Sequence, residues 1–332
     1  MPTEKETAFA EARRRRVRGS GLHLAVTEYG DAAKPTVLLV HGFPNTSAIW
    51  APVAKILSRG FHVVTYDVRG AGASDVPDSR AGYALSILVE DMAAVVHEMS
   101  PAAPVHLVGH DWGSIQGWEA VTTHLLDGRI ASFTSISGPP LDHAAMWARA
   151  HRTRRPADLR LMVGQAAHSW YIALFHLPFL PQLVTQGASM LRRISEALRR
   201  GIETAEGPRP GRATTTATAT TDDVAHGLEL YRANVRQRLR RPVEGHTETP
   251  VQIIVPVQDR YITPSLLDGL EAWSPVVWRR HVDTGHWIIR THPDEIAHWV
   301  RQVIAFVEDG YEAEDLARTR VDQEPSGQLP LP

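Results

Sequence analysis

Cysteine and long apolar runs are both absent from the 332-residue sequence. Without cysteine, the chain can form neither a disulfide bond nor a cysteine-ligated metal site. No run reaches the roughly 18 apolar residues that indicate a membrane span. The charged N-terminal sequence MPTEKETAFAEARRRR also lacks the apolar core of about 7 to 15 residues that a secretory signal requires. These absences lead us to expect a cytoplasmic protein.

Net charge is also small, because 35 basic residues face 37 acidic ones for a formal charge of −2. No overall basic field favours nucleic acid, and no acidic excess indicates a solvating tail. Small neutral substrates are therefore expected. Hydrophobic residues make up 43% of the chain, which is enough for a large core. We expect residues 1–19, including the run Arg13 to Arg16, to form a solvated N-terminal arm.

Short β-branched or apolar segments alternate with segments of helical spacing. The strand-like segments are Leu22–Tyr29, Thr36–His41, Phe61–Tyr66, Val105–Gly109, Ser132–Ser137, Val251–Pro256 and Val276–Val282. The helical segments are Ser47–Leu57, with Ser47 as its cap, Tyr83–Met99, Trp112–Leu126 and Pro293–Val307. Such alternation predicts a mostly parallel sheet covered by helices on both faces, an α/β fold.

The alternation breaks after Ser137. Residues 138–249 are helical, aromatic and arginine-rich, so they predict a helical cap inserted between two parts of the core, 20–137 and 250–308. Within the cap, the Pro-, Gly- and Thr-rich stretch at 205–221 predicts a mobile loop. Residues 309–332 are polar and are expected to be a tail or linker.

The strongest motif is Gly109-His110-Asp111-Trp112-Gly113, which follows an apolar strand and precedes a helix. This pattern is a nucleophile elbow, a tight turn that needs small residues two positions before and after its centre. The central residue is usually serine, but here it is Asp111, and a carboxylate attacks an alkyl carbon to form an ester. The alternative role for Asp111 is an ordinary helix N-cap, which the two glycines make less favoured.

At this point the chain, over residues 20–308, resembles the α/β-hydrolase superfamily, in particular its epoxide hydrolase and haloalkane dehalogenase branches. His41-Gly42-Phe43-Pro44 is similar to the family's H-G-x-P segment. The resemblance implies a cis Phe43–Pro44 bond and an oxyanion hole made by the N–H groups of Phe43 and Trp112. The segment 67–74 is similar to a structural D-x-R-G-x-G-x-S turn, and it lacks the third glycine of a dinucleotide-binding loop.

The remaining members of a triad should follow in the order acid, then histidine, at the ends of later strands. Asp259 follows the strand Val251–Pro256 and resembles the family's acid, while His286 in Asp283-Thr-Gly-His286 resembles its catalytic histidine. Asp283 competes with Asp259 for the acid role, but it lies three residues from His286 on the same tight loop. We therefore expect Asp259 to orient His286.

Two cap segments, around Tyr171 and Tyr231, look like those in which epoxide hydrolases keep a tyrosine directed at the nucleophile. An opening epoxide becomes an alkoxide, and phenols can donate a proton to it. Haloalkane dehalogenases use indole or amide N–H groups for the halide instead, so the Trp112 indole is ambiguous. We expect four aromatic residues to line an apolar tunnel or to pack in the core. They are Trp147, Trp170, Phe175 and Phe179.

The resemblance implies hydrolysis of an epoxide to a vicinal diol through an ester on Asp111, with no metal or organic cofactor. A haloalkane or haloacid dehalogenase with the same triad is the alternative, and a slow ligand-binding module of the same fold is another. The chain also resembles the N-terminal half of actinobacterial proteins in which an epoxide-hydrolase-like domain precedes a short-chain dehydrogenase domain. In that case the tail 309–332 would be an interdomain linker.

Overall fold

The computed structural model describes residues 12–153, 155–177 and 219–321. Across these ranges eight strands form one sheet in the order β1-β2-β4-β3-β5-β6-β7-β8. The strands are β1 (Arg13–Arg18), β2 (His23–Tyr29), β3 (Thr36–Val40), β4 (His62–Tyr66), β5 (Val105–His110), β6 (Ile130–Ile136), β7 (Val251–Pro256) and β8 (Val277–Val282). Only the β1–β2 and β2–β4 pairs are antiparallel. The fold is therefore the α/β-hydrolase fold with a mostly parallel sheet, as predicted.

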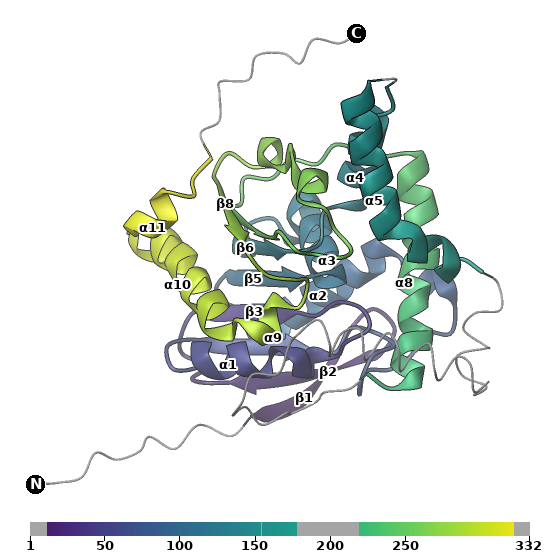
Figure 1. Ribbon diagram of the computed structural model, residues 1–332. Helices are drawn as coiled ribbons and strands as arrows, with labels where there is room; N and C mark the ends of the chain where they lie inside the picture. The colour runs from purple at the N-terminus through teal and green to yellow at the C-terminus, as the bar shows by residue number, and fades with distance from the viewer. Residues whose placement is uncertain (1–11, 154, 178–218, 322–332) are drawn as a thin grey trace, which may run out of the picture.

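Helices cover both faces of the sheet (Figure 1). The α-helices are α1 (Ala51–Leu57), α2 (Leu85–Met99), α3 (Trp112–Thr122), α4 (Leu141–Ala150), α5 (Pro156–Phe175), α8 (Thr221–Arg240), α9 (Ile288–Thr291), α10 (Pro293–Asp309) and α11 (Glu314–Ala317). The 3-10 helices are η1 (Ser47–Trp50), η2 (Arg80–Tyr83), η3 (His124–Leu126), η4 (Pro264–Leu267) and η5 (Leu270–Trp273).

Successive residues of the central strands enter two different cores. In β3, Val37 and Leu39 pack with α1, α9 and α10, whereas Leu38 and Val40 pack with α2 and α3. Because side chains alternate across a strand, a strand that is covered on both faces must be apolar throughout. All five residues of β3 are accordingly buried, which is why the sequence shows a continuous apolar run there.

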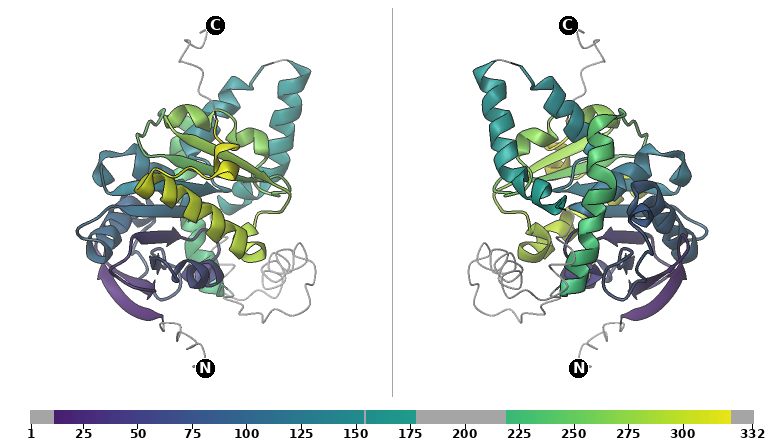
Figure 2. Two further views of the ribbon diagram at one scale, coloured as in Figure 1. Left: turned by 90° about the vertical axis from the view of Figure 1, so that its left-hand side faces the viewer. Right: turned by 90° about the vertical axis from the view of Figure 1, so that its right-hand side faces the viewer.

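The segment between β6 and β7 supplies α4, α5 and α8, and the right-hand view of Figure 2 shows α5 and α8 side by side. Helix α8 begins with a capping box, in which Thr220 and Asp223 exchange hydrogen bonds. Thr220 and Thr221 therefore belong to the start of α8 rather than to a mobile loop. The rest of the predicted loop, 205–218, and Phe179 lie outside the described residues.

The prediction of a solvated arm for the arginine run is wrong, because Arg13–Arg18 form the edge strand β1 paired with β2. Arg15 and Arg13 form ion pairs with Glu28, whose side chain is buried. Backbone pairing thus holds the segment, while its charged side chains remain exposed. A charged edge strand of this kind discourages edge-to-edge association.

Two smaller predictions also need correction. Ser47 was expected to cap its helix, but the residue in that position is Thr46, which makes no side-chain cap hydrogen bond. The tail was expected to begin at 309, yet α11 packs on the core because Leu316 is fully buried beside Trp278 and Val303. The Val321 N–H also donates to the Val277 carbonyl at 2.9 Å. Residues 309–321 therefore belong to the folded core and not to a tail or linker.

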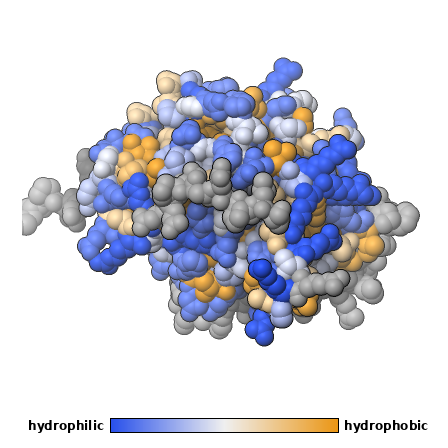
Figure 3. Space-filling view, turned by 90° about the horizontal axis from the view of Figure 1, so that it is seen from above, coloured by the Kyte–Doolittle hydropathy of each residue, from blue (hydrophilic) through white to orange (hydrophobic). Residues whose placement is uncertain are grey.

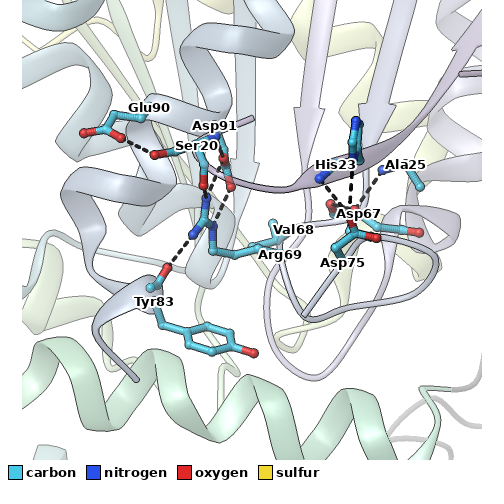
Figure 4. Close-up of polar contacts among 12 residues, drawn as sticks. Ser20, His23, Ala25, Asp67, Val68, Arg69, Asp75, Tyr83, Glu90 and Asp91 are labelled. Atoms are coloured by element: carbon cyan, nitrogen blue, oxygen red, sulfur yellow. Dashed lines mark hydrogen bonds and ion pairs between the residues drawn. The ribbon is translucent and has the colours of Figure 1, made fainter. Parts of the chain in front are cut away.

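The turn at 67–74 has a structural role, as predicted (Figure 4). Arg69 forms two hydrogen bonds with the buried Asp91, at 2.6 and 2.7 Å, and also donates to the carbonyl oxygen of Ser20. Asp67 accepts from the N–H groups of Ser47 and Ala73. These bonds join the turn between β1 and β2, helix α2 and the start of η1, and so they fix the loops at the carboxyl edge of the sheet.

Candidate active site

Asp111 stands at a strained turn between β5 and α3. Its backbone angles are φ 55° and ψ −122°, a combination that non-glycine residues seldom adopt. A Cβ atom on Gly109 would meet the Gly113 carbonyl, and a Cβ atom on Gly113 would meet the Val40 carbonyl. The turn can therefore close only with glycine at these two positions, which is the spacing that the sequence shows.

The Asp111 carboxylate lies beside backbone N–H groups. Its Oδ1 accepts from the Phe43 N–H at 2.7 Å, and the N–H of Trp112 also favours its charged form. It makes no helix-capping hydrogen bond with its side chain. Burial raises the pKa of Asp111 to about 6, although His286 and the two N–H groups act in the opposite direction. The Phe43–Pro44 bond is cis, as predicted.

His286 lies between two carboxylates, following β8. Its Nδ1 is 2.8 Å from Asp259 Oδ2, and its Nε2 is 3.6 Å from Asp111 Oδ2. Asp259 also accepts from the N–H groups of Tyr261 and Ile262, at 2.8 and 3.1 Å. Asp283, the rival acid, accepts instead from Gln258 at 2.7 Å on the surface. The acid that contacts His286 is therefore Asp259.

Burial and neighbouring charges shift the pKa values of His286 and Asp259 in opposite directions. Burial disfavours the imidazolium of His286, but the charge and hydrogen bond of Asp259, with a contribution from Asp111, raise its pKa above the ordinary histidine value. Burial likewise opposes the charge on Asp259, yet His286 and the backbone N–H groups bring its pKa below normal. The pair can thus take up a proton at His286 while Asp259 stays ionised.

His110 positions the loop that carries His286. It is fully buried, and burial followed by the nearby His286 lowers its pKa to about 3, so its ring is neutral. Its Nε2–H can then donate to the His286 carbonyl at 2.9 Å. His110 therefore packs within the turn and does not line the cavity.

Two phenols from the cap lie against this arrangement. Tyr231 from α8 packs edge-on against the rings of Trp112 and Phe43, with centroid distances of 4.9 and 5.5 Å. Tyr171 from α5 is 6.1 Å from Tyr231 by the same measure. Burial, with Asp111 adding to it, raises the pKa of both tyrosines above the ordinary value. Both phenols therefore keep their protons at neutral pH.

Asp111 and the two phenols line one cavity of about 990 Å³. Trp147 lines it too, as predicted. Trp170 does not, because its side chain is 67% exposed to solvent, so that prediction is wrong. Phe175 is buried behind the wall, where its ring contacts Phe43 and both tyrosines. It supports the phenols and is not a lining residue.

Sequence reasoning missed two residues near this site. Tyr261 follows Asp259 and packs edge-on against His286 and Tyr171, at 4.8 and 5.5 Å between ring centroids. Gln165, on α5, hydrogen-bonds the backbone of Tyr261 and both donors of Thr263. A signal for Gln165 existed, because it is a polar residue within the i, i+3, i+4 series that faces the cavity.

None of the described helices is both long and apolar enough to cross a bilayer. Within the same described ranges, no three His, Asp or Glu side chains gather so as to hold a metal ion.

The fold and the turn at Asp111 are those of an α/β hydrolase, and comparison with known proteins agrees. The chain belongs to the alpha/beta hydrolase fold family, whose model matches residues 35–293. It is an epoxide-hydrolase-like member, since several of its relatives are named epoxide hydrolases.

Individual relatives differ in how much of their length is matched. The chain is 33% identical to "Probable oxidoreductase EphD" of Mycobacterium tuberculosis over 307 residues, which cover 91% of this chain and 51% of that protein. It thus spans about half the length of that relative. It is 25% identical to mouse "Epoxide hydrolase 3", with 88% of this chain and 76% of the relative covered. An epoxide hydrolase of Bacillus megaterium, solved with an inhibitor, superposes with a TM-score of 0.70 at 24% identity, covering 87% and 99% of the two chains.

Proposed function

We propose that this protein hydrolyses an epoxide to a vicinal diol through a covalent ester on Asp111. One observation carries the proposal: a single cavity brings the Asp111 carboxylate, 3.6 Å from His286, together with two buried phenols. The core supplies a nucleophile and a base, and the cap supplies proton donors. Hydrolysis of an epoxide through an ester requires all three.

In the first step, Asp111 Oδ2 attacks an epoxide carbon. Oδ1 is held by the Phe43 N–H, so Oδ2 is the free nucleophile. The carbon–oxygen bond of the ring breaks, and the alkoxide takes a proton from Tyr171 or Tyr231. Because burial keeps both phenols protonated, the proton is available at neutral pH.

In the second step, His286 removes a proton from water, and the hydroxide attacks the carboxyl carbon of Asp111. The N–H groups of Phe43 and Trp112 hold the resulting oxyanion. Collapse of this intermediate breaks the ester and releases the diol, while Asp259 balances the imidazolium charge. The proton on His286 then returns to the tyrosinate left by the first step, so that all groups regain their starting states. This sequence of steps requires no metal or organic cofactor.

Hydrolysis of a carbon–halogen bond is the alternative reaction for the same triad. The ring of Tyr231 packs edge-on against the Trp112 indole, which would stabilise a halide, at a centroid distance of 4.9 Å. The two phenols in the cavity favour the epoxide, whose leaving oxygen needs a proton, over a halide, which does not.

We also propose that this chain is part of a larger protein with a second domain. The mycobacterial relative is named a probable oxidoreductase, and 51% of its length is covered by this chain. We infer that a short-chain dehydrogenase domain follows the hydrolase unit in the full-length protein. The reading frame downstream of residue 332 tests this directly.

Labelled water tests the covalent route. In one turnover with a slight excess of enzyme over styrene oxide, the solvent oxygen should enter the peptide that contains Asp111, because water attacks the ester carbonyl. Label that appears in the diol alone would mean direct attack of water on the epoxide. Parallel assays that measure bromide release from 1-bromobutane distinguish dehalogenase activity from epoxide hydrolase activity.

A further inference from the structure

Helix α8 presents two parallel rows of side chains to the cavity. Tyr231, Val235 and Leu239 form one row at four-residue spacing, and the adjacent row is Arg232, Arg236 and Arg240. All six side chains line the cavity. Four-residue spacing keeps each row on one side of the helix, so an apolar row and a basic row run beside each other from the candidate site outward. Seen from above, the surface of the molecule has hydrophilic residues directly beside hydrophobic ones (Figure 3).

Carboxylates form ion pairs with only some of the arginines that line the cavity. Glu229 bonds both Arg80, another lining residue, and Arg232, at 2.6 and 3.0 Å. In the part of the chain that the structure describes, no ion pair or hydrogen bond engages the side chain of Arg236 or Arg240. By contrast, the neighbouring Arg238 turns away from the cavity and pairs with two carboxylates.

The cavity around these two arginines is apolar and holds a single acid. Among its described lining residues the only carboxylate is Asp111, next to Tyr231 at the start of the two rows. Its walls are otherwise largely aliphatic and aromatic. They include Leu141, Trp147, Met162, Ile172, Val235 and Leu239.

Arginines near the C-terminus of a helix often serve only solubility and the helix dipole. That role accounts for their charge but not for their place on the wall of an apolar cavity.

This inference rests on the proposed function and gives its substrate class. We propose that the cavity takes an amphiphilic epoxide whose anionic head group binds Arg236 and Arg240 while its apolar chain lies along Val235 and Leu239. At about 1.5 Å per residue, the two arginines stand about 8 and 14 Å beyond Tyr231 along the axis of α8. The epoxide then reaches Asp111 from a head group at the outer end of the cavity. A guanidinium stays charged at all working pH values and matches carboxylate or phosphate oxygens in pairs.

Three substrates of one chain length test this class. They are the terminal epoxide of undecylenic acid, its methyl ester, and the epoxide of undecenyl phosphate. The parent enzyme should show a higher kcat/KM for the acid or the phosphate than for the ester. The preference should fall as salt is added, because exposed charges are screened. A preference for the phosphate over the acid would identify a phosphate head group, and the reverse a carboxylate.

Variants of the two arginines test whether they cause the preference for an anionic substrate. The double variant Arg236→Gln/Arg240→Gln should lower the acid-to-ester ratio of kcat/KM by about tenfold, the effect of removing two exposed charge pairs. Arg236→Lys/Arg240→Lys should retain most of the preference. Arg241→Gln removes the same charge from an exposed residue that does not line the cavity, and it should leave the ratio unchanged.

Direct binding of decanoate, compared with that of decanol, supplies a readout that needs no epoxide chemistry. The parent should bind decanoate more tightly than decanol, and this advantage should disappear in the double Gln variant. Equal hydrolysis of acid and ester by the parent, with no advantage for decanoate, would overturn the inference and leave the proposed function intact. Binding of decanoate that depends on the arginines, in a protein that opens none of the epoxides, would instead overturn the proposed function and leave the anion site standing.

Discussion

The two halves of the candidate site are held in place by different forces. Asp111, Asp259 and His286 come from loops at the carboxyl edge of the sheet, and hydrogen bonds of 2.7 to 3.1 Å from backbone N–H groups and from one another fix them. Tyr171 and Tyr231 come from cap helices, where edge-on ring contacts surround them. Hydrogen bonds thus position the three triad residues of the core half, whereas ring packing positions the two tyrosines of the cap half.

This difference indicates how the two halves can vary. A hydrogen-bonded carboxylate or imidazole cannot move by an ångström without losing its partner. Ring packing tolerates exchange of one aromatic residue for another of similar volume at moderate cost. We therefore expect the chemistry to depend on the core half, and the choice and orientation of the substrate to depend on the cap half.

The largest expected change in rate comes from variants of the two tyrosines in the cap half. Tyr171→Phe and Tyr231→Phe should each slow alkylation of Asp111 by an epoxide by about 10²-fold, because each removes a proton donor and little packing volume. The double variant should be nearly inactive, and since the phenols share one oxygen their effects need not add. Stopped-flow measurement of the first step gives these rates.

Tyr261→Phe is the matched control, because Tyr261 also contacts Tyr171 and His286 through its ring yet has no proposed proton to give. It should alkylate at the parental rate. If both cap variants also react at the parental rate, the cap tyrosines only pack, and the epoxide assignment loses its main support.

The next effect concerns the core half and pH. Asp111 must be ionised to attack, and its pKa is raised to about 6 by burial. The carboxylate predominates above that pH, so the alkylation rate should fall about tenfold per unit as the pH drops below about 6. Single-turnover rates across a pH series measure this. A rate that stays constant down to the ordinary aspartate pKa of about 3.9 would contradict it.

A smaller effect concerns the connection between the halves. Gln165 accepts from the Thr263 N–H and hydroxyl at 3.0 and 2.7 Å, and it donates to the Tyr261 carbonyl at 3.1 Å. It thus ties α5, which carries Tyr171, to the acid loop. Gln165→Leu should lower the free energy of unfolding by about 1 to 3 kcal/mol, because it leaves partly buried polar groups of Tyr261 and Thr263 unpaired.

Thermal or urea unfolding measures that change. Gln237→Leu, at an exposed position of α8, is the control and should alter stability by less than about 0.5 kcal/mol. An equally small loss for Gln165→Leu would show that the two halves are not coupled through this side chain.

The sequence revealed the core half better than the cap half, for physical reasons. A tight turn needs glycines at fixed spacing, and strand ends bring loops to one edge, so Asp111, Asp259 and His286 could be located from local patterns. A cap helix leaves only a periodic pattern. On α5 the cavity-facing series runs through Met162, Gln165 and Ser169, and Trp170 falls outside it, pointing to solvent.

Edges of the fold were harder to predict for a related reason. A run of arginines shows no alternation of apolar and polar residues, so the strand β1 left no hydrophobic signal. Its order comes from backbone pairing with β2 and from the buried Glu28, and both depend on residues distant in sequence. The same holds for Leu316, whose burial depends on Trp278.

The central claim is that Asp111 forms an ester which His286 then helps to hydrolyse. His286→Gln should still be alkylated by styrene oxide, because the first step needs only Asp111 and the phenols, but it should no longer release the diol. Intact-mass spectra should therefore show the protein plus one substrate, with the added mass on the peptide that contains Asp111. Asp111→Ala should show no such adduct. Absence of any adduct in His286→Gln, with an epoxide that the parent enzyme turns over, would contradict the account.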